Sequence, residues 1–98
     1  MKRLQDNVTI ITGGGKGIGF GLAQAFAEEG SNLVLTGRTE SRLVEAKKKL
    51  EEKYGIEVLP IVADGADEAA IKNVVAKSIE KFGKINTLVN NAQVSKSG

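Results

Sequence analysis

The chain has 98 residues, of which 41% are hydrophobic and 27% are charged, and its net charge is +2. This length allows one domain at most. The absence of cysteine and histidine excludes a disulfide framework, a thiolate metal site and the commonest metal ligand and general base. The nearly balanced charge and few aromatic residues argue against a nucleic-acid partner, and the apolar runs are too short for a membrane span. We expect a cytoplasmic protein, because no secretory signal is visible.

Strand-like and helix-like segments alternate along the chain. Strands are predicted at residues 8–12, 32–36, 57–62 and 85–89, and helices begin near Gly17, after Thr39 and after Asp67. Thr39 and Asp67 are the expected N-caps, and Gly30, Gly55 and Gly83 end the three helices. The expected core positions are Leu43, Ala46 or Lys47, and Leu50 in the second helix, and Ile71, Val74, Val75, Ile79 and Phe82 in the third.

Pro60 interrupts the third predicted strand. Proline cannot donate a ladder hydrogen bond, so this strand belongs at the edge of a sheet. A doubly wound order 3-2-1-4 puts the third strand there, and alternating strands and helices favour parallel pairing with right-handed crossovers. The predicted fold class is therefore α/β, with a partial Rossmann-type doubly wound parallel sheet.

A glycine-rich run, Thr12-Gly13-Gly14-Gly15-Lys16-Gly17-Ile18-Gly19, joins the first strand to the first helix. Glycines let a backbone approach a ligand closely, and the start of a helix offers unpaired N–H groups and a positive dipole to phosphate. The run therefore predicts dinucleotide binding, with a ligand-free turn as the alternative. A P-loop is excluded because Gly17, rather than Ser or Thr, follows Lys16. The G-x-G-x-x-G fingerprint fails at its third glycine, where Ile18 stands.

The pattern that does fit is Thr-Gly-x-x-x-Gly-x-Gly, at Thr12, Gly13, Gly17 and Gly19. Residues 88–92, Leu-Val-Asn-Asn-Ala, are similar to an Asn-Asn-Ala-Gly signature, and Asp64 follows the third strand. Together these motifs resemble the short-chain dehydrogenase/reductase family, in particular its 3-oxoacyl-[acyl-carrier-protein] reductase-like members. The resemblance covers the whole chain but only the N-terminal part of the family's fold. It implies that residues 1–98 are a dinucleotide-binding segment of a longer single domain.

The resemblance implies a set of cofactor-binding residues. They are Thr12, Gly13, Gly15, Lys16, Gly17, Ile18, Gly19, Arg38, Asp64, Gly65, Asn90 and Ala92. The pyrophosphate is expected over the glycine run, the adenine beside Asp64 and Gly65, and the adenine-side ribose beside Asn90. Thr12 would brace the loop through its hydroxyl. Two alternatives stay open, since Ile18 could pack in the core and Asp64 could be a turn residue.

Cofactor choice is expected to depend on the end of the second strand. NAD-type sites place an acidic residue there to bind the ribose hydroxyls, but this chain has Gly37 followed by Arg38. Without the carboxylate a 2′-phosphate meets no repulsion, and a guanidinium suits that phosphate. Lys16 could add a second positive charge. We therefore expect NADP rather than NAD.

The family's catalytic Ser and Tyr-x-x-x-Lys are expected beyond residue 98. Tyr54 is followed four residues later by Val58 rather than Lys, so it is predicted to be a packing residue. The function expected is the NADP(H)-binding part of a homo-oligomeric oxidoreductase that moves a hydride between NADP(H) and a carbonyl or alcohol. Residues 1–98 alone would be inactive. The alternative is a stand-alone nucleotide-binding module without catalysis.

Overall fold

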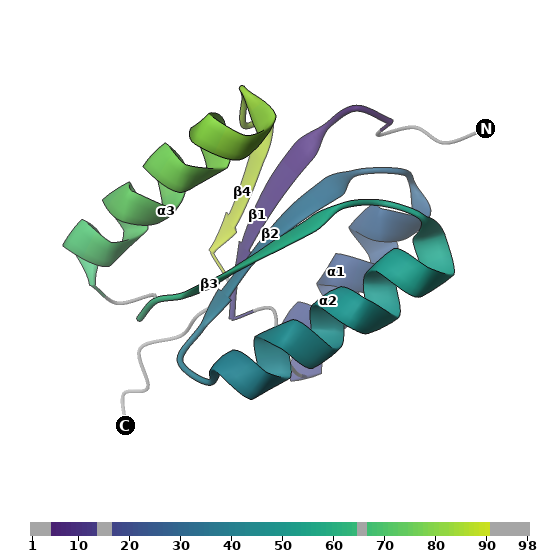
Figure 1. Ribbon diagram of the computed structural model, residues 1–98, viewed down its shortest axis with the longest axis horizontal. Helices are drawn as coiled ribbons and strands as arrows, with labels where there is room; N and C mark the ends of the chain where they lie inside the picture. Colours follow the sequence, from purple (N-terminus) through teal and green to yellow (C-terminus); the bar gives the residue numbers. More distant parts are fainter. Residues whose placement is uncertain (1–4, 14–16, 65–66, 91–98) are drawn as a thin grey trace.

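The computed structural model describes residues 5–13, 17–64 and 67–90. Strands and helices alternate along them as predicted. In chain order they are β1 (Val8–Thr12), α1 (Gly17–Glu28), β2 (Asn32–Gly37), α2 (Glu40–Tyr54), β3 (Val58–Val62), α3 (Glu68–Phe82) and β4 (Thr87–Asn90). The sheet forms the middle layer, with α1 and α2 on one face and α3 on the other (Figure 1).

The four strands form one parallel sheet in the order β3-β2-β1-β4, which confirms the predicted fold class. Thr12 at the end of β1 lies opposite Thr36 of β2 and Asn90 of β4. Gly37 lies opposite Val62 at the end of β3. This register brings the carboxyl ends of all four strands to the same edge of the sheet.

Two apolar cores lie on the two faces of the sheet. Toward α1 and α2, Ile11, Leu33 and Leu35 pack with side chains that include Leu43, Ala46 and Leu50. Toward α3, Val8, Ile10 and Val34 pack with Val74 and Ile61. Burying one such side chain contributes about 1.5–3 kcal/mol. The central strands are buried on both faces because helices cover each side, so their sequences read as continuous apolar runs.

The two predicted N-caps differ in their hydrogen bonds. Thr39 is the N-cap of α2 in an extended conformation, as predicted, but its side chain makes no capping hydrogen bond. Asp67 does cap α3, since its Oδ1 accepts from the N–H groups of Ala69 at 3.0 Å and Ala70 at 3.3 Å. The backbone carbonyl of Thr39 instead accepts from the N–H groups of Arg42 and Leu43.

The predicted core face of α3 is wrong at one position. Ile79 is 49% exposed, while its neighbour Ser78 is fully buried and donates its hydroxyl to the Val74 carbonyl at 2.7 Å. Val74 and Ser78 are four residues apart and lie on the same helix face, which turns Ile79 about 100° away. In α2, the sequence left open whether Ala46 or Lys47 occupies the core position, and the structure shows that the buried residue is Ala46. Among the described residues, no helix is long and apolar enough to cross a membrane.

Candidate functional site

The candidate site lies at the carboxyl edge of the sheet, where polar and glycine residues follow the strands. In open parallel sheets ligands bind outside the carboxyl ends of the strands, at the point where the strand order reverses. Here β1 and β4 flank that point, because the chain runs outward from β1 through β2 to β3 and returns to β4. The residues that lead out of β1 and β4 are therefore the first to consider.

The glycine turn begins with Gly13, whose φ of 72° lies in the left-handed region. Its N–H donates to the Thr36 carbonyl at 2.8 Å, which fixes the start of the turn to the end of β2. Gly17 opens α1 with a φ of 62°. Side chains disfavour both conformations, so the glycines at these two positions are required by backbone geometry. The predicted site residues Gly15, Lys16, Gly65 and Ala92 lie outside the described residues.

The start of α1 is suited to an anion. Its first turn contains no acidic side chain, so no carboxylate opposes the positive end of the helix dipole. Ile18 in this turn is 76% exposed, which rules out the alternative that it packs in the core. Gly19 is buried, as expected for a residue where the helix approaches the sheet closely. An exposed isoleucine beside polar N–H groups offers an apolar surface next to the candidate anion site.

Thr12 and Asn90 tie the ends of the two central strands together. The Thr12 hydroxyl donates to Asn90 Oδ1 at 3.1 Å, and the Val89 carbonyl oxygen lies 3.4 Å away as a second acceptor. Thr12 is buried and Asn90 is exposed, so the bond runs from the core to the surface of the edge. The described contact of the Thr12 hydroxyl is thus with β4. It orients the Asn90 amide at the strand end.

The end of β2 carries Gly37 and Arg38. A Cβ built on Gly37 would lie 3.4 Å from Leu43 Cδ2, an ordinary van der Waals contact, so this position has room for a small side chain. Arg38 is exposed, and neither of the two ion pairs found between described residues involves it. Its guanidinium therefore lies in solvent at the same edge as the glycine turn.

Asp64 follows β3, two residues beyond Val62. Its backbone carbonyl accepts from the Asp67 N–H at 2.9 Å, which forms the turn leading into α3. Its side chain is exposed. Asp64 therefore has the turn role that the sequence left open as its alternative. Asp64 thus lies just beyond the end of β3 at the carboxyl edge, where its carboxylate was predicted to contact adenine.

Thr36 is a feature of this edge that the sequence did not single out. Its side chain is fully buried, and its Oγ1 is the buried side-chain oxygen left without a hydrogen-bond partner among the described residues. It lies beside Thr12 in the register of β1 and β2. A buried hydroxyl without a partner costs about 1–3 kcal/mol. The sequence Thr-Gly-Arg indicates where the strand ends, but it does not reveal that the Thr36 hydroxyl is buried without a partner among the described residues. That burial is seen only in the packed structure.

Comparison with known proteins places these features in context. The family model described as short chain dehydrogenase matches residues 7–98. A 12alpha-hydroxysteroid dehydrogenase from Clostridium sp. is 54% identical to this chain, over 93% of the chain and 38% of that protein.

Two solved structures resemble this chain in both fold and sequence. L-sorbose reductase from Gluconobacter frateurii, solved with NADPH and L-sorbose, superposes with a TM-score of 0.91 at 38% identity, covering 97% of this chain and 36% of that one. NAD⁺-bound xylitol dehydrogenase gives a TM-score of 0.87 at 34% identity, covering 93% of this chain and 35% of that one. The chain thus spans between a third and two fifths of the length of these relatives.

Proposed function

This chain belongs to the short-chain dehydrogenase family, and we propose that its carboxyl edge binds NADP(H) in an oxidoreductase acting on a carbonyl or alcohol. Residues 1–98 would be the cofactor-binding part of a longer single domain. The cofactor supplies the hydride, and the protein binds and orients it and handles the proton. The Ser, Tyr and Lys that handle the proton are proposed to lie outside residues 1–98.

The pyrophosphate is assigned to the glycine turn and the start of α1. Gly13 and Gly17 hold left-handed conformations, and the helix that follows has no acidic residue in its first turn. Backbone N–H groups at such a position donate to phosphate oxygens without an opposing charge. Gly15, Lys16 and Gly19 belong to the same proposed contact, and the exposed Ile18 side chain would cover part of the cofactor.

The adenosine is assigned to the ends of β3 and β4. The exposed Asp64 carboxylate would accept from the adenine amino group, with Gly65 beside it. The Asn90 side chain, oriented by its bond from Thr12, would line the adenine-side ribose, and Ala92 would follow along the same loop. The register of the sheet places the ends of β3 and β4 at the same edge.

NADP is proposed over NAD because of the end of β2. The relatives do not decide this, since one solved neighbour holds NADPH and another holds NAD⁺. The choice must therefore come from this chain's own residues. Gly37 has no carboxylate to repel a 2′-phosphate, and the exposed Arg38 has a planar guanidinium suited to bind one.

The observation that carries the proposal is the β1–β2 register, which sets Gly13 against the Thr36 carbonyl and so brings Arg38 to the edge that holds the glycine turn. Titration calorimetry with 2′-phospho-ADP-ribose and ADP-ribose tests it. We expect the phosphorylated ligand to bind about ten- to a hundredfold more tightly, the value of a charge-assisted bidentate contact. Arg38→Ala should remove this difference, whereas Arg42→Ala, which removes another exposed arginine, in α2, should leave it. Equal affinities for both ligands in the wild type would refute the NADP assignment.

A further inference from the structure

Among the described strands, β3 forms one edge of the sheet and pairs with β2 alone. Alternate residues of a strand direct their backbone groups to opposite sides. The Glu57 carbonyl accepts from Leu33 and the Ala63 N–H donates to Gly37, so the odd-numbered residues of this segment pair with β2. The backbone groups of Val58, Pro60 and Val62 therefore point outward. An edge of this kind is a template for pairing with another chain.

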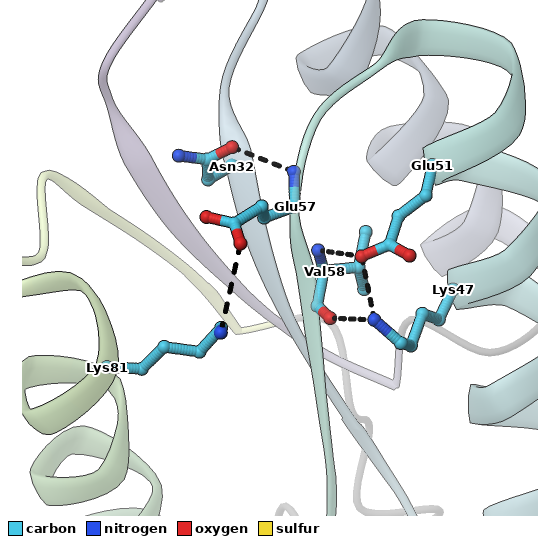
Figure 2. Close-up of polar contacts among 6 residues, drawn as sticks. All are labelled: Asn32, Lys47, Glu51, Glu57, Val58 and Lys81. Atoms are coloured by element: carbon cyan, nitrogen blue, oxygen red, sulfur yellow. Dashed lines mark hydrogen bonds and ion pairs between the residues drawn. The ribbon is translucent and has the colours of Figure 1, made fainter.

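Side chains from α2 occupy the first of these outward positions. The Val58 N–H donates to Glu51 Oε2 at 2.9 Å, and the Val58 carbonyl accepts from Lys47 Nζ at 3.0 Å (Figure 2). Lys47 and Glu51 are themselves joined at 2.7 Å. The pair thus binds both outward backbone groups of Val58 as a neighbouring strand would. At the next outward position, Pro60 has no N–H to offer.

This pair differs from an ordinary exposed pair on a helix. Partial burial acts to raise the pKa of Glu51, but the hydrogen bonds from Lys47 and the Val58 N–H and the charges of Lys47 and Lys81 outweigh it, so the pKa lies below its ordinary value. Lys48 and Glu52 have the same spacing one residue further along α2, yet both are exposed. The contrast shows that the contact with the strand edge, rather than the helix spacing, distinguishes Lys47 and Glu51.

The start of β3 is held by two further contacts. The Glu57 N–H donates to Asn32 Oδ1 at 2.9 Å, and the Glu57 carboxylate lies 3.9 Å from Lys81 Nζ of α3 (Figure 2). Neither these two contacts nor the pairing of β3 with β2 involves Lys47 or Glu51. Loss of these two α2 side chains would therefore uncover the edge without releasing the strand.

We propose that Lys47 and Glu51 guard the outer edge of β3 against pairing with the same edge of a second copy of this protein. The occupant is a second copy because two identical edges related by a two-fold axis present the same donors and acceptors to each other. Val62, 54% exposed at the end of the strand, adds apolar surface to that contact. The Lys47–Glu51 pair, which we call the guard, blocks the outward position at Val58, and Pro60 blocks the next one.

The test compares two double variants in the intact protein that contains this chain. Lys47→Ala/Glu51→Ala removes the guard, and Lys48→Ala/Glu52→Ala removes a pair of the same charge, spacing and helix. Sedimentation velocity from micromolar to millimolar concentration should show assembly beyond the wild-type mass for the first variant alone. Adding Val62→Lys, which puts a charge at the edge, should reverse that assembly. Lys47→Met keeps the aliphatic stem and removes the bonds to the Val58 carbonyl and to Glu51, while Glu51 remains to bind the Val58 N–H, so it repeats the test with a smaller change.

Hydrogen exchange at the Val58 amide separates an uncovered edge from general unfolding. At low concentration this amide should exchange about tenfold faster in the guard variant, the value of one lost hydrogen bond to a charged group. It should regain protection as the variant assembles, while the amides of β1 stay protected throughout. An unchanged mass at millimolar concentration, or equal assembly by the Lys48/Glu52 variant, would overturn the proposal.

Discussion

Gly37→Asp tests whether the end of β2 selects the cofactor. The new Cβ would lie 3.4 Å from Leu43 Cδ2, and the Gly37 backbone is not among the left-handed positions, so aspartate fits without strain. The site is half-buried and next to the exposed Arg38. The substitution therefore changes the charge at the proposed 2′ position while leaving the sheet and the glycine turn intact.

The expected effect has two parts. A carboxylate roughly 5 Å from a 2′-phosphate, at an effective dielectric constant of about 20, is repelled by about 3 kcal/mol per pair of unit charges, or about a hundredfold in affinity. The same carboxylate accepting from a ribose hydroxyl contributes about 1.5 kcal/mol, or about tenfold. The preference for NADP-type over NAD-type ligands should therefore fall about a thousandfold at low salt.

Titration calorimetry with 2′-phospho-ADP-ribose and ADP-ribose measures both parts. Gly37→Ala is the matched control, because it adds the same Cβ against Leu43 without the charge. The control should bind both ligands as the wild type does. The reasoning fails if Gly37→Asp weakens both ligands alike, or if Gly37→Ala shifts the preference as far.

Three further predictions concern the glycine turn, the β3 edge and the chain in isolation. Gly13→Val should abolish dinucleotide binding, because its φ of 72° strains a β-branched residue, and calorimetry on a variant still folded by circular dichroism checks this. Because the pKa of Glu51 is lowered in the folded state, its contribution to stability is present above its ordinary pKa of 4.5 and is lost as the pH falls through the lowered value. Urea unfolding should thus show a wild-type advantage over Glu51→Gln at neutral pH that shrinks below about pH 4.5; a constant advantage would contradict it. Residues 1–98 alone should self-associate through β4 and show no carbonyl-reductase turnover, as measured by light scattering and NADPH oxidation; a monomer or genuine turnover would contradict these expectations.

Much of the fold was predictable because local and global signals agree. The alternation of short apolar runs with helical periods predicts a parallel sheet, and Pro60 alone identifies which strand lies at an edge. The turn chemistry also transfers directly, since Asp67 caps α3 and the glycines Gly55 and Gly83 end their helices in the left-handed conformation. These features depend on one or two residues and their immediate backbone.

The errors arise where a side chain depends on distant neighbours. Periodicity cannot distinguish Ser78 from Ile79, because a buried serine satisfies its hydroxyl within the helix and then packs as a small residue. Nor can it show that Lys47 reaches the Val58 carbonyl, since that contact joins α2 to a strand formed later in the chain. At the site, the sequence left open whether Ile18 faces the cofactor or packs in the core, and its 76% exposure excludes core packing among the described residues.

The two edges of the sheet differ in a way that bears on the proposed larger domain. At β3, Pro60 lacks an N–H, and Lys47 and Glu51 bind the outward groups of Val58. β4 has neither proline nor lysine, and Leu88 in its centre is 52% exposed. Among the described strands β4 pairs with β1 alone. β1 is buried along its whole length. Proteins blunt exposed edges because unpaired N–H and C=O groups are a template for pairing with another chain. We therefore propose that a further strand of the longer single domain would cover β4, whereas β3 would remain an end of the sheet.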